Sequence, residues 1–329
     1  MNKYLGHPLQ ITGVEEMTLT KGKGKGMTLL NIRNGKGLDV MLSADRAMDI
    51  SRLTFEGVNM GYFGPCGYVG PSFYDNKGEG FLKSFSAGFL TTCGLTAVGN
   101  PNTDDGEELP LHGTIGNTPC EDYTYAETDT EITVNATLRE ASMFGKKLLF
   151  TRNYTISKTE NSITIEDEIY NYGDKQVPCM ILYHFNMGYP LLSEHAKLTI
   201  PYNSITPRCE NSRKHMDTAL QMEQPQANYK ECNYVYDLKA VDNMASIGIY
   251  NPDIQKGLKM TVDKRTLDLF NEWKMMGEHD YVLGLEPANC ACDGRNIMRE
   301  KGILKFLDAG ATYKTFVKVE FGCKDFFAE

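Results

Sequence analysis

The chain has 329 residues, of which 41% are hydrophobic and 23% are charged, and its formal net charge is −9. This balance is that of a globular protein with a sizeable core, and it argues against disorder. An acidic surface is a poor partner for nucleic acid or for an anionic membrane, so neither partner is expected, whereas a neutral small molecule is compatible with it.

Features of the N-terminal sequence and the cysteines predict a cytoplasmic location. MNKYLGHPLQ lacks the apolar stretch and the small-residue cleavage site of a secretory signal. No uninterrupted apolar run reaches the ~20 residues that cross a bilayer. The nine cysteines are an odd number without the spacing of a disulfide framework, so most are expected to be free thiols in a reducing compartment.

Short strands dominate the pattern along the chain. The predicted strands, rich in β-branched residues or alternating apolar with polar, are 27–33, 38–44, 131–138, 162–171, 246–251, 257–262 and 312–322. Helical periodicity is weak, and only residues 80–87 suggest a short helical turn. Such a series of strands predicts an all-β sandwich or barrel. Because no linker or repeat divides the chain, a single domain over residues 1–329 is expected.

Two local motifs do not carry a cofactor. The glycine-rich stretch from Lys21 to Gly26 lacks the pattern of a phosphate-binding loop and precedes a strand, so it is predicted to be a flexible hairpin loop. Cys290 and Cys292 form a C-A-C sequence, which is neither a redox motif nor half of a zinc site. No metal, nucleotide or redox cofactor is therefore expected.

Two residues in apolar strands are candidates for acid–base chemistry. His184 lies in MILYHFN (180–186), where it could be a neutral core histidine satisfied by hydrogen bonds or a histidine whose pKa burial has shifted for function. Glu286 closes the apolar strand YVLGLE (281–286). Its carboxylate either points to water or is desolvated, and desolvation raises the pKa of a general base.

Three further residues could bind a ligand. His112 lies between a proline and a glycine in ELPLHG (108–113), and it could equally satisfy a loop carbonyl. Arg46 could pair with Asp45 or Asp49, or it could donate its guanidinium N–H groups to sugar hydroxyls. Trp273, the single tryptophan, could fill the core or form a platform for a sugar ring.

These same segments resemble a known family. The sequence is similar to the aldose 1-epimerase-like proteins of the galactose mutarotase-like superfamily, in particular to a bacterial branch catalogued as a domain of unknown function (DUF4432-like). The resemblance runs in order along most of the chain and is carried by ADRAMDIS (44–51), FLTTCGLTAVGNP (89–101), DDGEELPLHG (104–113), LREASMFG (138–145), NSITIEDEIYN (161–171), ILYHFNMGYPLL (181–192) and WKMMGEHDYVLGLEPANC (273–290).

The resemblance implies a large antiparallel β-sandwich and a cofactor-free enzyme that interconverts sugar anomers. It implies His184 as the acid that protonates the ring oxygen and Glu286 as the base for the anomeric hydroxyl, with Arg46 and His112 as sugar-binding residues. Asn186 falls at a shifted position of the family motif around the acid histidine, and it is a further binding candidate. The aspartate that completes the family site has no clear equivalent, although Asp217 lies in the corresponding part of the chain.

Two other functions remain open on the same fold. One is a carbohydrate-binding or sensing protein without catalysis. The other is a carbohydrate lyase or hydrolase, although a classical hydrolase would present two carboxylates to the scissile bond, whereas one carboxylate and two histidines stand out here. The sugar and the oligomeric state are not indicated by the sequence.

Overall fold

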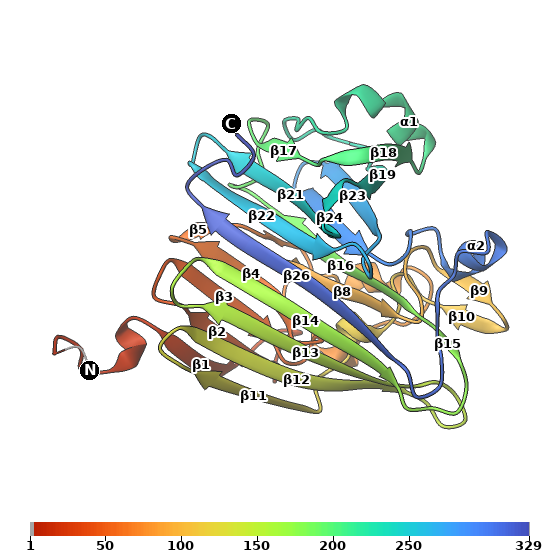
Figure 1. Cartoon of the computed structure of the whole chain (residues 1–329), viewed down its shortest axis with the longest axis horizontal. Helices are drawn as coiled ribbons and strands as arrows, with labels where there is room; N and C mark the ends of the chain where they lie inside the picture. The colour runs from red at the N-terminus through yellow and green to blue at the C-terminus, as the bar shows by residue number, and fades with distance from the viewer. Residues whose placement is uncertain (1–2, 329) are drawn as a thin grey trace.

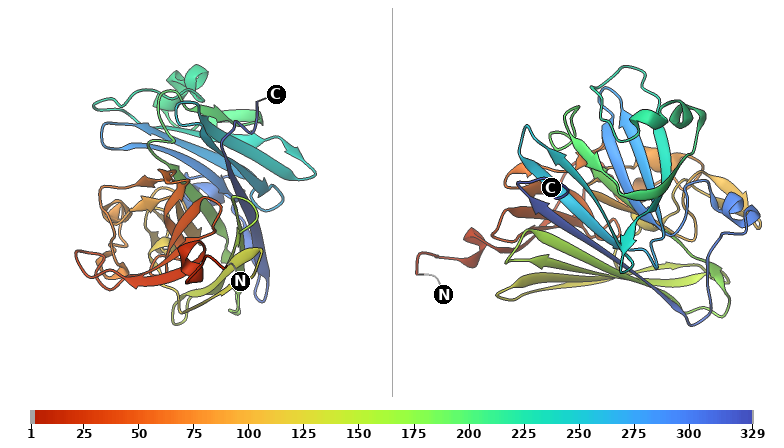
Figure 2. Two further views of the ribbon diagram at one scale, coloured as in Figure 1. Left: turned by 90° about the vertical axis from the view of Figure 1, so that its left-hand side faces the viewer. Right: turned by 45° about the horizontal axis from the view of Figure 1, so that its top comes forward.

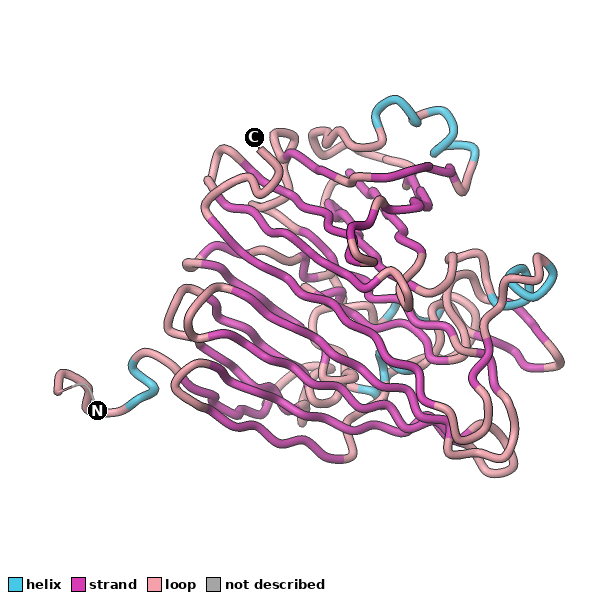
Figure 3. Tube along the Cα trace, in the orientation of Figure 1, coloured by secondary structure: helices cyan, strands magenta, loops and turns pink. Residues whose placement is uncertain are grey.

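The computed structural model describes residues 3–328, so residues 1, 2 and 329 of the predicted 1–329 domain lie outside the described residues. Strands make up most of its regular structure, and the few helices are short (Figure 3). The helices are η1 Pro8–Gln10, η2 Pro71–Phe73, η3 Gly80–Lys83, η4 Ile115–Asn117, α1 Glu210–Lys214, η5 Met216–Thr218 and α2 Arg295–Glu300. Within residues 3–328, no helix is long and apolar enough to span a membrane.

The N-terminal part of the chain forms a five-stranded antiparallel sheet in the order β1-β2-β3-β4-β5. Its strands are β1 Gly13–Thr18, β2 Thr28–Arg33, β3 Leu38–Ser43, β4 Asp49–Phe55 and β5 Val58–Asn59. The glycine-rich stretch Lys21 to Gly26 connects β1 to β2, which confirms its prediction as a hairpin loop. Figure 2 shows this sheet, in red, packed beside the largest sheet.

The largest sheet has nine strands, in the order β11-β12-β13-β14-β26-β22-β21-β17, with β20 beside β21 (Figure 1). The C-terminal strand β26 therefore lies in its middle, between β14 and β22. The strands are β11 Asp122–Glu127, β12 Glu131–Ala141, β13 Lys147–Ser157, β14 Ser162–Asn171, β17 Lys197–Thr199, β20 Ala240–Val241, β21 Met244–Asn251, β22 Lys256–Asp263 and β26 Thr312–Gly322.

A six-stranded antiparallel sheet, in the order β18-β19-β23-β24-β16-β8, carries His184, Trp273 and Glu286. Its strands are β8 Leu90–Leu95, β16 Met180–Met187, β18 Tyr202–Pro207, β19 Cys232–Leu238, β23 Leu269–Met276 and β24 Tyr281–Ala288. Three two-stranded sheets complete the fold, formed by β6 Tyr62–Phe63 with β7 Ala87–Gly88, β9 Asn102–Asp104 with β10 Glu107–Leu109, and β15 Val177–Pro178 with β25 Phe306–Leu307.

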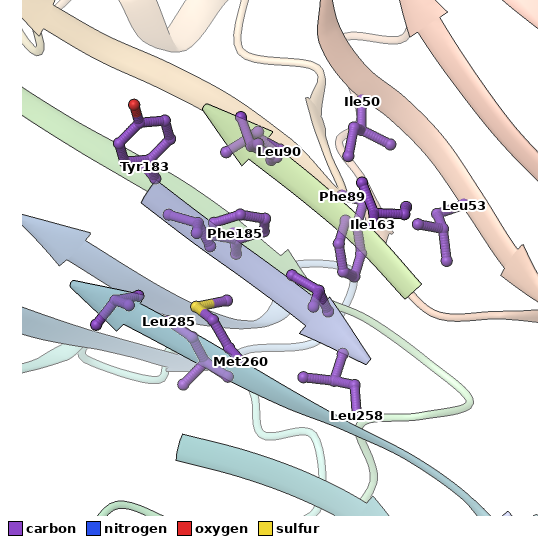
Figure 4. Close-up of a cluster of buried hydrophobic side chains, with 14 of the residues drawn as sticks. Ile50, Leu53, Phe89, Leu90, Ile163, Tyr183, Phe185, Leu258, Met260 and Leu285 are labelled. Carbon is purple, nitrogen blue, oxygen red and sulfur yellow. The ribbon is translucent and has the colours of Figure 1, made fainter. Parts of the chain in front are cut away.

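Alternation along the strands produces the core between the sheets. In β12 and β13, buried and more exposed residues alternate along the whole strand, as expected where one face of a sheet packs inward. Phe89 and Phe185 meet edge-on with their ring centroids 5.6 Å apart (Figure 4). Each strand predicted from the sequence is present as β2, β3, β12, β14, β21, β22 or β26, so the predicted all-β fold is confirmed.

A fully buried arginine ties three sheets together inside this core. The guanidinium of Arg152 on β13 contacts Asp49 on β4 at 2.6 Å and Asp167 on β14 at 2.7 Å. It also donates to the hydroxyl of Thr92 on β8, and the hydroxyl of Tyr183 on β16 donates to Asp167. Because Tyr183 precedes His184, this network anchors the strand that carries the first acid–base candidate.

Candidate active site

His184 and Glu286 face each other on neighbouring strands of the six-stranded sheet. Strand β16 pairs with β24 in the register that places Leu182 opposite Ala288 and Phe185 opposite Leu285, so His184 lies opposite Glu286. The distance from Nε2 of His184 to Oε1 of Glu286 is 3.1 Å. Two residues that are about a hundred positions apart in the sequence thus form one pair.

Burial of the pair sets the protonation of both groups. His184 is 4% exposed and Glu286 is 2% exposed. Desolvation lowers the pKa of His184 to about 4. It raises the pKa of Glu286 to about 8, against the opposing effect of the nearby charge of Arg208. At neutral pH the pair in the free protein therefore holds one titratable proton, and that proton is on Glu286. The family resemblance implies the reverse, an ionised glutamate and a protonated histidine.

His184 is not a core histidine satisfied by hydrogen bonds, and Glu286 does not point to water. Nδ1 of His184 has no hydrogen-bond partner among the described residues, so this is not a histidine satisfied within the core. Oε1 of Glu286 also lacks a hydrogen-bond partner there, because its contact with Nε2 of His184 is close without being aligned. Buried polar atoms without partners are rare in folded proteins, and they are typical of sites that await a ligand.

The pair lines the floor of an open cavity of about 330 Å³. Gly284 on β24 leaves room for it, because a Cβ atom there would lie 2.5 Å from Oε1 of Glu286 and 3.2 Å from Cε1 of His184. The volume suits a monosaccharide and the mixed lining suits its polar and apolar faces. The other lining residues are Glu79, Phe81, Leu82, Phe85, Gly99, Asn100, Leu111, His112, Arg208, Cys209, Glu231, Asn233, Trp273 and Cys292.

Trp273 and His112 both lie beside His184 in this cavity. The ring centroids of Trp273 and His184 are 5.4 Å apart, and the indole Nε1 of Trp273 donates to Glu231 at 2.7 Å. His112 lies 5.6 Å from His184, and desolvation lowers its pKa to about 3, so it is neutral. Its Nδ1 has no partner among the described residues, so its ring does not satisfy a loop carbonyl through that atom.

Arg208 is a cavity residue that the sequence analysis did not identify. It follows strand β18, where its backbone N–H donates to the carbonyl of Asn233 on β19. Its Nε donates to Asp293 at 3.1 Å, which fixes the guanidinium at the side of the cavity near Glu286. The sequence offered no signal for Arg208, because TPRCEN (206–211) is a polar turn whose place beside the cavity arises only from sheet pairing.

Three predicted residues are not brought into this cavity. The guanidinium of Arg46 donates through Nε and Nη1 to the backbone carbonyls of Gly116, Val69 and Ser84, and Arg46 does not line this cavity, so its sugar-binding role stays a prediction. Asn186 lies on β16 with its amide donating to the carbonyl of His184, and it supports the strand without lining the cavity. Asp217 lies in η5, also outside the lining.

The cysteines near the cavity are free thiols. Cys290 and Cys292 are buried, and Sγ of Cys292 lies 3.8 Å from Oε2 of Glu286. Desolvation, followed by the charge of Glu286, raises the pKa of the Cys292 thiol well above its ordinary value. Across residues 3–328, no group of three or more His, Cys, Asp or Glu side chains is arranged to hold a metal ion.

The antiparallel sheets and the cavity on the six-stranded sheet define an all-β protein with a cavity of ligand size. Residues 24–321 match the family described as a domain of unknown function, DUF4432, and the chain belongs to that family. No protein with a curated description matches its sequence.

Solved structures support the fold assignment. A provisionally assigned aldose 1-epimerase from Klebsiella pneumoniae is 27% identical, with a TM-score of 0.89 over 95% of this chain and 83% of that chain. A galactose 1-epimerase from Lactobacillus acidophilus is 15% identical, with a TM-score of 0.64 over 94% of this chain and 99% of that chain. A galactose mutarotase-like protein from Clostridium acetobutylicum is 13% identical, with a TM-score of 0.68 over 95% and 99%.

Proposed function

We propose that this protein is an aldose 1-epimerase-type enzyme that opens and recloses the ring of a small sugar by acid–base catalysis. The observation that carries the proposal is the 3.1 Å approach of His184 and Glu286 on the floor of a monosaccharide-sized cavity. Opening a hemiacetal requires removal of a proton from the hydroxyl on C1 and delivery of a proton to the ring oxygen. A pair of neighbouring groups that holds one proton supplies both needs.

The two distributions of that proton correspond to the two halves of the reaction. With Glu286 ionised and His184 protonated, Glu286 removes the proton from the C1 hydroxyl and His184 protonates the ring oxygen, so the ring opens to the aldehyde. The carbonyl then rotates about the C1–C2 bond. Glu286 now holds a proton and His184 is neutral, so His184 takes the proton of the C5 hydroxyl while Glu286 protonates the carbonyl oxygen, which closes the opposite anomer.

The resting free protein stands at the second of these distributions, because burial keeps the proton on Glu286. Ring opening starts after the proton crosses the 3.1 Å between the two side chains. Arg208 favours this transfer, because its positive charge lowers the pKa of Glu286 against the larger opposing effect of burial. Trp273 and the phenylalanines of the cavity exclude water and cover the apolar face of the sugar.

Proton NMR of anomer exchange across a panel of aldoses tests the proposal. The wild-type protein should accelerate exchange for at least one sugar, and Glu286→Gln or His184→Asn should reduce that acceleration by ~10²- to 10⁴-fold. His195→Asn is the matched control, because His195 forms an exposed pair with Asp253 at 2.6 Å and does not line the cavity. Its exchange rate should equal that of the wild type.

Binding measured separately distinguishes an enzyme from a carbohydrate-binding protein. Trp273 is the single tryptophan and lines the cavity, so its fluorescence reports sugar binding without turnover. If sugars bind and no aldose exchanges faster with the protein than without it, the protein is a binding or sensing protein and the catalytic proposal is wrong.

A further inference from the structure

Four of the residues that line the cavity have no polar side-chain atoms. They are Phe81, Leu82, Phe85 and Leu111, which we call the apolar wall. Phe85 meets His184 edge-on at 5.3 Å between ring centroids, and Phe81 packs on Phe85 at 4.9 Å. The apolar wall therefore begins directly beside the histidine of the acid–base pair.

Polar lining residues lie next to Glu286. Cys292 approaches Oε2 of Glu286, and the charge of Arg208 acts on the same carboxyl group. Asn233 and Glu231 also line the cavity on strands or turns at this end of the sheet. Hydroxyl groups of a bound sugar find donors and acceptors here, in contrast to the apolar wall.

The order of the strands gives the direction from Glu286 to the apolar wall. Glu286 lies on β24, His184 on the next strand β16, and β8 follows on the far side of β16. Residues 81–85 lie just before β7 and β8 in the chain, and the ring of Phe85 contacts that of His184. Moving from Glu286 past His184 therefore leads to the apolar wall.

The roles of Glu286 and His184 orient a pyranose ring that binds to the pair. The anomeric hydroxyl lies at Glu286 and the ring oxygen at His184, so C5, which is bonded to the ring oxygen, lies beyond His184. The substituent on C5 then points toward Phe85 and Phe81. His112, the polar ring that touches Phe81, is neutral and brings no charge to attract an anion there.

We propose that this site selects aldoses whose C5 substituent is apolar or missing, namely 6-deoxyhexoses and pentoses, over hexoses with a C6 hydroxyl, carboxylate or phosphate. The inference rests on the proposed function, because it uses the assignment of Glu286 to the anomeric hydroxyl. A C6 hydroxyl against the rings of Phe81 and Phe85 loses its water without gaining a hydrogen bond from either ring, and a C6 anion loses more.

Matched sugar pairs test this selectivity through the fluorescence of Trp273, with calorimetry as a second measure of binding. The pairs are D-fucose with D-galactose, L-rhamnose with L-mannose, and D-xylose with D-glucose. The two members of each pair differ only in the substituent on C5. The member without the C6 hydroxyl should bind about 5- to 100-fold more tightly, the range expected for burying an unpaired hydroxyl. Galactose 6-phosphate and galacturonate should bind more weakly than galactose.

A polar substitution in the apolar wall should abolish the preference. Phe85→Asn places an amide where the C6 hydroxyl lies, so the ratio between each pair should fall to about one. Phe144→Asn is the matched control, because Phe144 is 95% exposed on the hairpin between β12 and β13 and does not line the cavity. The control should keep the wild-type ratio. An unchanged ratio in Phe85→Asn would overturn the assignment of the wall.

The outcomes separate this inference from the catalytic proposal. A preference for the deoxy members without any anomer exchange supports the inference for a binding protein and rejects catalysis. Exchange with galactose binding as tightly as fucose supports catalysis and overturns the inference. Tighter binding of the C6 anions also overturns it, since the sugar would then lie with C5 toward Arg208. Binding of no member by either measure overturns it as well.

Discussion

His184 and Glu286 occupy opposite positions on two neighbouring strands, where the surrounding sheet and loops remove almost all of their contact with water. Desolvation disfavours the charged form of each group, so it moves the two pKa values in opposite directions, and they cross. The pair then retains a single proton over a wide range of pH, which is the state that proton exchange with a hemiacetal requires.

The pH profile of kcat/KM follows from this crossing. Below about 4, His184 takes up a second proton, and above about 8, Glu286 loses the last one, so activity should form a bell with a broad neutral plateau. The residual activity of His184→Asn should lose the acid limb, and that of Glu286→Gln should lose the alkaline limb. The opposite assignment of limbs would mean that attraction between the groups outweighs burial.

Arg46 shows why a residue type and its spacing do not identify a binding group. The sequence offered a pair with Asp45 or Asp49, or a sugar contact; among the described residues Arg46 forms no ion pair with either aspartate, and it lies outside the cavity of His184 and Glu286. Asp49 pairs with Arg152, Asp45 accepts the backbone N–H of Thr28, and Arg46 binds three carbonyls. Which acceptor each donor meets depends on tertiary packing, and no local pattern records it.

The substitution Arg46→Met should therefore affect folding and leave the sugar site intact. Removing the guanidinium leaves buried carbonyl groups without a donor, which should lower the free energy of unfolding by about 1–3 kcal/mol. Urea unfolding measures this loss, and Trp273 fluorescence should give unchanged sugar affinity for the folded variant. A large loss of affinity at full stability would restore Arg46 to the binding site.

At the scale of elements, the strands were predictable because a period of two is a local property of the sequence. Strand β14 and strand β26 were predicted over their full observed ranges, 162–171 and 312–322. The pairing of strands was not predictable, and the site depends on it. Arg208 enters the cavity because β18 pairs with β19, and β19 with β23, over long intervals of sequence.

Arg152 tests how the elements are held together. Its replacement in Arg152→Met leaves Asp49 and Asp167 buried without their cation, which should cost about 3–5 kcal/mol of stability. Arg139→Met is the matched control, because the pair of Arg139 with Glu121 is exposed to solvent, and it should cost far less stability than Arg152→Met. Urea unfolding of both variants measures the difference, and equal losses would contradict the anchoring role of Arg152.

At the scale of the whole molecule, the chain weaves between sheets instead of completing one before starting the next. The nine-stranded sheet takes strands from 122–171, 197–199, 240–263 and 312–322. The six-stranded sheet takes β8 from before residue 122 and its other five strands from the intervals between those segments. A cut after β14 would separate it from β26, its partner over nine residue pairs, and would divide the six-stranded sheet. Each part would expose a long edge that the other part covers.

This weaving leads us to propose that the chain folds as one domain and unfolds in a single transition. Circular dichroism of the strands and Trp273 fluorescence from the cavity should follow the same thermal curve, and the calorimetric enthalpy should equal the van't Hoff enthalpy.

Deleting residues 312–329 removes β26 from the middle of the nine-stranded sheet, so the truncated chain should not fold. Deleting residues 1–7 is the matched control, since that segment precedes η1 and contributes no strand among its described residues. Two separated transitions, or a truncated chain that still binds sugar, would show that the chain contains more than one independent unit.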